Sequence, residues 1–428
     1  MTKSLVIGLG RSGLALARFL AARGDRVTVA DTKDRQQLAD QVARLPEGVE
    51  LALGGYGDLL LLGVDEVYAS PGVPWDDSLL KAARRRGIRV SSELDLFFRH
   101  CLAPIVGITG TNGKTTTTAL TGAVLARGDR PVIVGGNIGE TVLDRLAHVT
   151  PEHVVVLELS SFQLESIERP HAHVGVVLNV TPDHLDRHGT FQAYAAAKAR
   201  LVQLLEPSDF AVLNSEDLTC RAFAQMTRGH VVWFDHHRPP PPMPVPGRHN
   251  VMNALAAASV GRLMGLDDER INAAVAGFAG VEHRLELVGE WDGVRWYNDS
   301  KATNPDAGRM ALAAFAGTPL VLIAGGHGGG FDLGDWLADI RRLVASVIVI
   351  GESGPELERE LAAAGHPDVR RARDLDQAVD LAAAAAAPGS VVLLSPGYKS
   401  FDWFTSFEDR GRRFKASVLR HHARKARR

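Results

Sequence analysis

The chain has 428 residues, more than one hydrophobic core usually serves, so two or three domains are expected. Its 48 lysines and arginines nearly balance its 50 aspartates and glutamates, which gives no sign of a nucleic-acid or membrane-surface protein. Two cysteines cannot form a disulfide framework, no apolar run is long enough to span a bilayer, and no signal-peptide pattern opens the chain, so a cytoplasmic protein is expected.

Short apolar runs alternate with helical stretches along the chain, which predicts an α/β fold built on parallel sheets. A strand at 4–10, a helix at 14–24 and a strand at 26–31 form the first such unit. Further strands are predicted at 66–70, 104–110, 153–159, 173–180, 210–214, 319–326, 346–351 and 390–397. Alternation around Asp292-Gly293 predicts a β-hairpin over 281–299.

Changes of pattern near residues 93 and 281 predict three domains. These are a Rossmann-like domain over 1–93, a central P-loop-type ATPase domain with a mostly parallel sheet over 94–281, and a second Rossmann-like domain over 282–428. The proline-rich segment 239–246 cannot be a helix or a central strand, so we interpret it as a stiff surface loop, with a partner-binding segment as the alternative.

The first candidate site follows the first predicted strand. Gly8, Gly10 and Gly13 have the spacing of a dinucleotide-binding turn, and Asp31 ends the next strand, where an acid contacts a hydroxyl. Taken alone, this pattern predicts NAD. A different nucleotide stays open, because the turn recognises a pyrophosphate.

The second candidate site is the run "GTNGKTT" from Gly110 to Thr116, between a predicted strand and a predicted helix. A Walker A motif would need glycine where Ile108 stands. The parts that bind phosphate are nevertheless present: a glycine loop at a helix N-terminus, Lys114 as a point charge and Thr115 as a magnesium-binding hydroxyl. This predicts an ATP or GTP site, and a chance surface loop is the weaker alternative.

Groups that bind hard cations follow two strands of the central domain. Glu158 ends one strand, and Asp183, His184, Asp186 and His188 follow another, although such residues are often only caps or turns. By itself Lys198 has the appearance of a solvated helix lysine. The segment "YNDSKATNP", residues 297–305, packs an acid, a base and small polar groups into one strand end, which indicates a site.

Seven segments together resemble the Mur ligases: "GTNGKTT", "LELSSFQLE", "NVTPDHLDRHGT", "AKARL", "HNVMNALAA", "EHRLE" and "NDSKATNP". The resemblance covers nearly the whole chain. It implies a ligase that adds D-glutamate to UDP-N-acetylmuramoyl-L-alanine: ATP phosphorylates the substrate carboxylate, and the amine of D-glutamate then displaces phosphate. It further implies two Mg²⁺ sites, a monomer and a role in cytoplasmic peptidoglycan precursor synthesis.

The resemblance also assigns residues. Lys114, Glu158, His184, Lys198 and Lys301 are the implied catalytic residues, and Lys198 matches a lysine that is carbamylated. Implied metal ligands are Thr115, Glu158, His184 and Lys198. Implied ATP contacts are Gly110, Thr111, Asn112, Gly113, Lys114, Thr115, Thr116, Asn250, Asn253, Arg284 and Asp299. Implied contacts to the UDP substrate are Arg11, Ser12, Asp31, Thr32, Ser70, Pro71, Gly72, Asn137, Gln163 and His184. Implied D-glutamate contacts are Thr303, Ser400, Phe401 and Phe407.

One departure from the family concerns D-glutamate. The family usually has a lysine after the strand at 319–326, and this chain has Gly329 there. Our hypothesis is that His327, Arg371 or Arg373 takes its place.

Three other classes of protein are weighed against this assignment. An NAD(P)-dependent oxidoreductase would use the first glycine turn but leaves the lysine loop unexplained. A nucleotide-controlled switch protein would need an Asn-Lys pair to recognise guanine, and the chain has none. A sibling Mur ligase or a folylpolyglutamate synthase-like ligase would share the phosphate loop, and "NDSKATNP" argues against both.

Overall fold

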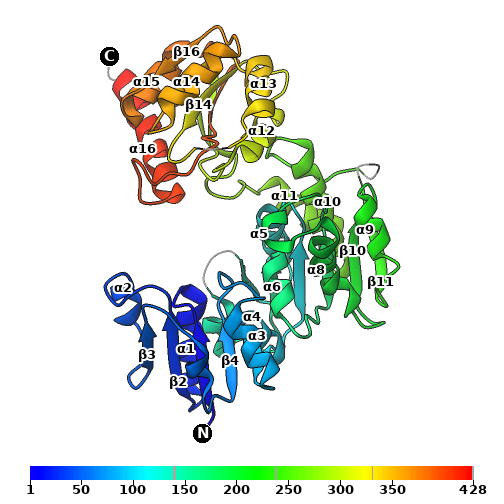
Figure 1. Cartoon of the computed structure of the whole chain (residues 1–428). Coiled ribbons are helices and arrows are strands. Elements are labelled where there is room, and N and C mark those ends of the chain that lie inside the picture. Colours follow the sequence, from blue (N-terminus) through cyan, green and yellow to red (C-terminus); the bar gives the residue numbers. More distant parts are fainter. Residues whose placement is uncertain (138–140, 236, 238, 330, 427–428) are drawn as a thin grey trace. The chain divides into compact units, whose positions relative to one another are not determined.

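The computed structural model describes residues 1–137, 141–235, 237, 239–329 and 331–426, except for the side chains of Asp186 and Ala426. The chain forms two compact units, one of Met1–Pro241 with Met252–Val275 and the other of Pro242–Val251 with Ala276–Arg428. The first unit contains two sheets and the second contains one (Figure 1). The proposed domain boundaries near 93 and 281 stay predictions.

The first sheet is parallel, with strand order β3-β2-β1-β4-β5. Along β1, Val6 packs into one core with helix α1, whereas Leu5 and Ile7 pack into a second core with α3. Helices therefore cover both faces, as expected of a parallel sheet whose side chains alternate. The elements are β1 Lys3–Ile7, α1 Arg11–Ala22, β2 Arg26–Asp31, α2 Ala39–Val42, β3 Glu50–Leu53, η1 Asp58–Leu61, β4 Glu66–Ala69, α3 Ser78–Arg85, β5 Arg89–Ser92 and α4 Glu93–His100.

The second sheet is also parallel, with order β11-β10-β9-β6-β8-β7. Strand β6 pairs with β8 on one side and β9 on the other, so the loops after these three strands meet at one edge. The elements are β6 Ile105–Thr109, α5 Lys114–Leu125, β7 Val132–Gly136, η2 Val142–His148, β8 Val154–Glu158, α6 Ser161–Ser166, β9 Val174–Val177, α7 Leu185–His188, α8 Phe191–Gln203, β10 Phe210–Asn214, α9 Leu218–Phe223, β11 His230–Phe234, α10 Arg248–Leu263 and α11 Asp268–Ala276.

The third sheet is mixed, with order β12-β13-β17-β14-β15-β16. The hairpin β12–β13 is antiparallel and turns at Asp292 and Gly293, as predicted, and the other pairs are parallel. The elements are β12 Glu286–Trp291, β13 Val294–Asn298, α12 Pro305–Ala313, β14 Leu320–Gly325, α13 Gly334–Leu343, β15 Ser346–Ile350, α14 Gly354–Ala363, β16 Val369–Arg371, α15 Leu375–Ala385, β17 Val391–Leu394 and α16 Phe407–Ala426.

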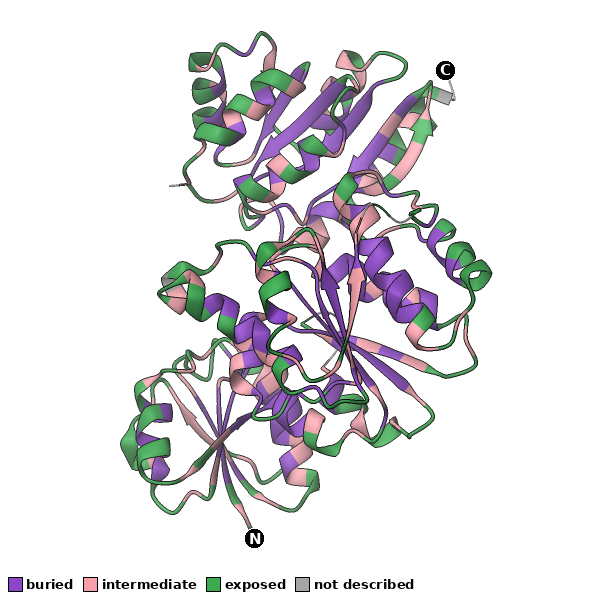
Figure 2. Ribbon diagram, turned by 90° about the vertical axis from the view of Figure 1, so that its right-hand side faces the viewer, coloured by how far each residue is buried: buried purple, intermediate pink, exposed green. Residues whose placement is uncertain are grey.

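Every strand predicted from the sequence is present, and the central strands are buried along their length (Figure 2). In the part of the chain that the structure describes, no helix combines the length and apolar character needed to cross a membrane. The α/β class with two parallel sheets and a mixed C-terminal sheet is thereby confirmed.

Candidate active site

The phosphate loop joins the central strand β6 to helix α5. Gly113 caps α5 with φ of +83°, a left-handed conformation that favours glycine. A Cβ at this position would also lie 2.4 Å from Oδ1 of Asn253, so Asn253 would have to move if a larger residue stood there. The loop glycine is therefore favoured both by the backbone turn and by the close approach of Asn253, a predicted ATP contact.

Hydrogen bonds to the segment that follows β9 hold the loop in place. The amide of Asn112 donates to Oδ1 of Asn179 at 2.8 Å, and Asn179 Nδ2 donates back to the Asn112 carbonyl at 3.1 Å. The hydroxyl of Thr111 accepts the amide of Thr181 at 3.0 Å. These bonds join the loops after β6 and β9 into one rigid edge, which favours a preformed site.

Two lysines from different helices meet at this edge. Lys114 Nζ donates to the carbonyls of Gly110 at 2.9 Å and Thr111 at 2.8 Å. Lys198 Nζ, on α8, donates to the same Gly110 carbonyl at 2.8 Å and is 1% exposed. Burial, with a further contribution from Lys114, lowers the pKa of Lys198 to about 6, so its amine is mostly neutral at physiological pH. Lys198 is therefore a buried amine and not the solvated surface lysine that the sequence by itself suggested.

Glu158 ends β8, next to the phosphate loop in the sheet. Its side chain is 2% exposed, and Oε1 accepts a hydrogen bond from Nδ2 of Asn137 at 3.0 Å. Among the described residues, its other oxygen, Oε2, is buried without a hydrogen-bond partner. Such an oxygen is costly unless something binds it, and a hard cation prefers carboxylate oxygens. Glu158 thus fits its predicted role as a metal ligand.

His184 lies on the same edge, after β9. It has a left-handed backbone, with φ of +52°, and its ring is 5.0 Å from the ring of Phe162 and 6.4 Å from that of Tyr194. Tyr194 also lies 4.6 Å beneath Lys198 Nζ and hydrogen-bonds Thr111 at 3.0 Å. The side chain of Asp186, another candidate ligand, lies outside the described residues.

Tyr194 links three predicted site residues but escaped the sequence analysis. Its only signal is the spacing of four residues from Lys198 on a helix, which places both side chains on one face. His188, a candidate cation ligand, instead stacks on Phe162 at 5.2 Å and lies 3.0 Å from Glu165.

The N-terminal glycine turn has the geometry that the sequence predicted. A Cβ on Gly13 would lie 1.9 Å from the carbonyl oxygen of Gly8, so only glycine allows this approach of helix and strand. Asp31 Oδ2 accepts the amide of Leu9 at 2.7 Å, and Ser70 Oγ donates to the Gly8 carbonyl at 2.7 Å. Asp31 and Ser70 therefore stabilise the turn itself.

Among the other predicted UDP contacts, some line a pocket or the surface, and some make hydrogen bonds within the protein. Arg11 lines a pocket of about 420 Å³, together with Gly10, Leu14, Arg18, Gln41, Arg44, Thr141 and Asp144. Thr32 and Gly72 are exposed, and Pro71 is half-buried. Ser12 donates to Glu93 at 3.0 Å, and Gln163 forms the capping box of α6 with Ser160. Of the predicted contacts, only Arg11 lines this pocket.

In the second unit, Asp299 follows β13 and is buried. Its Oδ1 accepts the amide of Leu285 at 3.2 Å and its Oδ2 the hydroxyl of Ser395 at 2.9 Å. Burial raises the pKa of Asp299 to about 7, while hydrogen bonds and Arg284 act in the opposite direction. Asp299 and Arg284, both predicted ATP contacts, are thus neighbours.

This pKa predicts how stability depends on pH. Because the folded state keeps the Asp299 proton where the unfolded chain has lost it, stability should fall as pH rises from about 4 to about 7 and then level off. Asp299→Asn should remove that decline, so its melting temperature relative to the parent should be several degrees higher at about pH 8 than at about pH 5. Equal pH profiles would contradict the raised pKa, and Asp335→Asn, at an exposed position, is the control.

A buried arginine that the sequence analysis missed joins the loops of this unit. Arg410, on α16, is 0% exposed and donates to Ser300 Oγ at 3.0 Å and to the carbonyls of Ser300 at 2.9 Å, Tyr398 at 3.1 Å and Lys399 at 3.2 Å. The loops after β13 and β17 are therefore fixed to each other. In the charged run "FEDRGRRF" nothing distinguishes this arginine from its exposed neighbours.

The predicted D-glutamate residues lie on or beside these loops. Ser400 is 2% exposed and Phe401 is 64% exposed. The carbonyl of Phe407 accepts a hydrogen bond from the Ser300 hydroxyl at 2.8 Å, and Lys301 Nζ lies 6.0 Å from the Phe407 ring. Thr303 is half-buried two residues beyond Lys301.

Asn250, a predicted ATP contact, is 3% exposed and donates to the Pro246 carbonyl at 2.6 Å.

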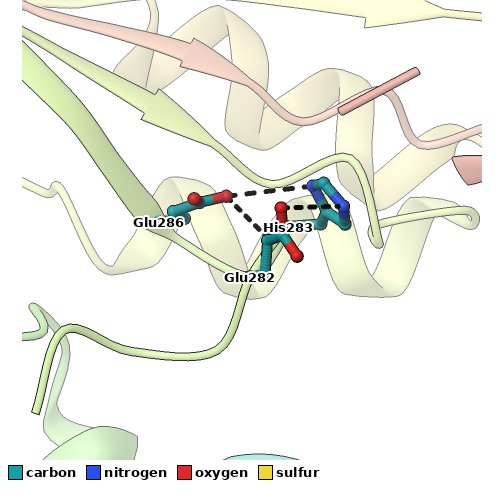
Figure 3. A group of neighbouring side chains, drawn as sticks. All are labelled: Glu282, His283 and Glu286. Carbon is teal, nitrogen blue, oxygen red and sulfur yellow. Dashed lines mark hydrogen bonds and ion pairs between the residues drawn. The ribbon is translucent and has the colours of Figure 1, made fainter. Parts of the chain in front are cut away.

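Only one group of three or more His, Cys, Asp or Glu side chains comes within metal-binding distance in the described chain: Glu282, His283 and Glu286 (Figure 3). Lys415 Nζ already donates to Glu282 at 2.7 Å and to Glu286 at 2.8 Å. His283 is buried against Asn298, whose Nδ2 is 2.9 Å from the His283 ring. One lysine therefore already pairs with both carboxylates, and the group supports the turn before Arg284.

Three sheets, a glycine loop with two lysines and a buried carboxylate at one sheet edge are typical of α/β proteins that bind nucleotide phosphates. The sequence matches the Mur ligase MurD-like N-terminal domain over residues 2–92, the Mur ligase middle domain over 108–240 and the Mur ligase glutamate ligase domain over 283–397. The chain belongs to the Mur ligase family.

Curated relatives of nearly the same length are named UDP-N-acetylmuramoylalanine–D-glutamate ligase. The protein from Pelotomaculum thermopropionicum is 42% identical and that from Anaeromyxobacter dehalogenans 44%, with 97% of this chain covered and 97% and 96% of theirs. Among solved structures, MurC from Thermotoga maritima is similar with a TM-score of 0.60, 21% identity and coverage of 99% of this chain and 100% of that one. MurF from Acinetobacter baumannii gives 0.61 at 17% identity over 98% and 94%, which supports the fold.

Proposed function

We propose that this protein is an ATP-dependent ligase that joins D-glutamate to UDP-N-acetylmuramoyl-L-alanine. The observation that carries the proposal is the full-length likeness to relatives that bear this name, at 42% and 44% identity. The phosphate loop and the buried Glu158 supply parts that such a reaction needs. The product is a peptidoglycan precursor, and we place the enzyme in the cytoplasm as a monomer.

In the first step the substrate carboxylate attacks the γ-phosphorus of ATP, forming an acyl phosphate and releasing ADP. The loop Gly110–Thr116 presents backbone amides to the phosphates, and Lys114 neutralises the charge that moves to the leaving oxygen. Asn250, Asn253, Arg284 and Asp299 bind the adenosine part. Positioning and charge neutralisation thus account for most of the catalysis.

In the second step the amine of D-glutamate attacks the acyl carbon, loses a proton and expels phosphate. Thr303, Ser400, Phe401 and Phe407 orient the amino acid, and Lys301 lies toward the reacting phosphate. Arg11, Ser12, Asp31, Thr32, Ser70, Pro71, Gly72, Asn137, Gln163 and His184 hold the UDP substrate. The amine must be neutral and aligned at the moment of attack.

Magnesium fits this site, because Glu158 Oε2 is buried and uncommitted. Thr115 and Glu158 would hold it with His184 and a carbamylated Lys198, at two positions, and bound magnesium would neutralise the phosphate oxygens. The neutral amine of Lys198 can add to carbon dioxide and lose a proton, which turns it into an anionic oxygen ligand.

An assay of ADP release tests the proposal. With ATP, magnesium and UDP-N-acetylmuramoyl-L-alanine, D-glutamate should support turnover, whereas L-glutamate, L-lysine and a diamino acid should not. Turnover with one of these but not with D-glutamate would contradict the proposal and favour a sibling ligase. Binding of a reduced nicotinamide cofactor, followed by its fluorescence, would instead favour the oxidoreductase alternative.

A further inference from the structure

Three basic side chains follow neighbouring strands of the third sheet. Lys301 follows β13, Lys399 follows β17 and His327 follows β14, and these strands are adjacent in the order β13-β17-β14. A ligand with two carboxylates requires cations, and the carboxyl edge of a parallel sheet is where ligands bind. This edge is therefore where a dicarboxylic amino acid would find its charge partners.

His327 and Lys399 form an isolated antiparallel bridge between their two loops. The amide of His327 donates to the carbonyl of Lys399 at 2.8 Å. Residues directly opposite in an antiparallel pair project their side chains to the same face, about 5 Å apart at Cβ. The side chains of Lys399 and His327 thus leave the bridge on the same face, and Lys399 directly precedes the buried Ser400 in the chain.

The two side chains differ in their charge partners. His327 Nδ1 is 2.6 Å from Oε2 of Glu352, so a negative group already occupies that ring nitrogen. The side chain of Lys399 is exposed, and among the described residues its ammonium has no hydrogen bond or ion pair. Another acid, Glu356, lies near Gly329, 3.7 Å from the point where a Cβ would be. Lys399 is therefore the cation of this bridge that is available to a ligand.

The arginines considered from the sequence are less well placed. Arg371 ends the outermost strand β16, three positions from β17 in the sheet, and lies 3.6 Å from Glu358. Arg373 lies beyond β16, with its side chain 82% exposed and 3.5 Å from Asp374. Neither is close in the sheet to Ser400 or Lys301.

We propose that Lys399 binds a carboxylate of the incoming D-glutamate through its ammonium, and so supplies the cation that is missing at Gly329. This inference rests on the proposed function. The side chain can change without disturbing the fold, because only the backbone carbonyl of Lys399 contacts His327 and Arg410. Lys399 is thus a substrate-binding residue that sets specificity for an acidic amino acid.

The test measures Lys399→Gln, which keeps a polar side chain one atom shorter than lysine and removes its charge. KM for D-glutamate should rise about 10- to 100-fold, with kcat nearly unchanged and KM for ATP and the UDP substrate unaltered. Lys399→Arg, which keeps the positive charge, should have a KM for D-glutamate close to that of the parent. If D-glutamine is a measurable substrate, an unchanged KM for it would assign Lys399 to the side-chain carboxylate, and a matching rise would assign it to the α-carboxylate.

An unchanged KM for D-glutamate in Lys399→Gln would overturn the inference, and a rise confined to His327→Ala would transfer the role to His327. Lys425→Gln, an exposed lysine of the same unit that pairs with Asp292, is the matched control and should behave as the parent. Activity of the parent enzyme with D-glutamate distinguishes the failure of the proposed function from the failure of the Lys399 inference. If the parent does not use D-glutamate, the proposed function fails. If it does, the KM of Lys399→Gln decides the role of Lys399.

Discussion

Lys114→Ala is expected to lower kcat for ADP release by about 1,000- to 100,000-fold, the range seen when a cation that stabilises a transferring phosphoryl group is lost. Lys114 is the first residue of α5, and its ammonium donates hydrogen bonds to the carbonyls of Gly110 and Thr111 in the phosphate loop. The change should be measured by steady-state ADP release at saturating substrates.

Lys114 also supports the loop, so its loss could act through loop structure alone. Nucleotide binding and melting temperature therefore accompany the kinetic measurement, and they should change far less than kcat. Lys81→Ala, an exposed lysine of the same unit that pairs with Asp76, should retain full activity. Activity of Lys114→Ala within tenfold of the parent would remove Lys114 from the phosphoryl-transfer step.

Lys198→Ala is expected to lose about 100- to 1,000-fold in kcat, because it removes both the implied carbamate and the anionic oxygens that the carbamate offers to a cation. Lys198→Met, which keeps most of the buried volume, should lose as much. Carbon-13 NMR with labelled bicarbonate should show a carbamate signal in the parent that is absent from both variants.

The NMR signal separates the chemistry of Lys198 from its packing. Lys114→Ala should keep the carbamate signal, although its kcat is also expected to be very low. Near-normal activity of Lys198→Met, or no carbamate signal in an active parent enzyme, would reject the carbamate role. Loss of activity together with a much lower melting temperature in both variants would mean that Lys198 acts only through the fold.

The strands that the sequence failed to predict share one position: each lies at the edge of a sheet. These are β3, β5, β7, β11 and β16. The strands predicted from continuous apolar runs lie inside the sheets, where helices cover both faces. An edge strand keeps one side near water and tolerates polar residues, so β16 reads Val-Arg-Arg and β3 begins with Glu50. This reason does not extend to β7 and β11, which are mostly apolar.

The site was predictable to the extent that local sequence determines it. The turn at Gly113, the end of β8 at Glu158 and the turn at Gly13 follow from short motifs whose geometry the structure reproduces. The burial of Lys198 and Arg410 could not be predicted, because it depends on packing between elements far apart in the chain. The bridge from His327 to Lys399 likewise joins two loops separated by more than one strand-helix unit.

The guanidinium of Arg410 also affects the thermodynamics of binding. It ties the loop after β13 to the loop after β17 from inside the unit, through carbonyls and one hydroxyl. Ordering a free loop on binding would oppose affinity, and loops already fixed to a core avoid that entropic cost. For the proposed binding of D-glutamate at these loops, we therefore expect a heat capacity change no larger than burial of the ligand surface requires.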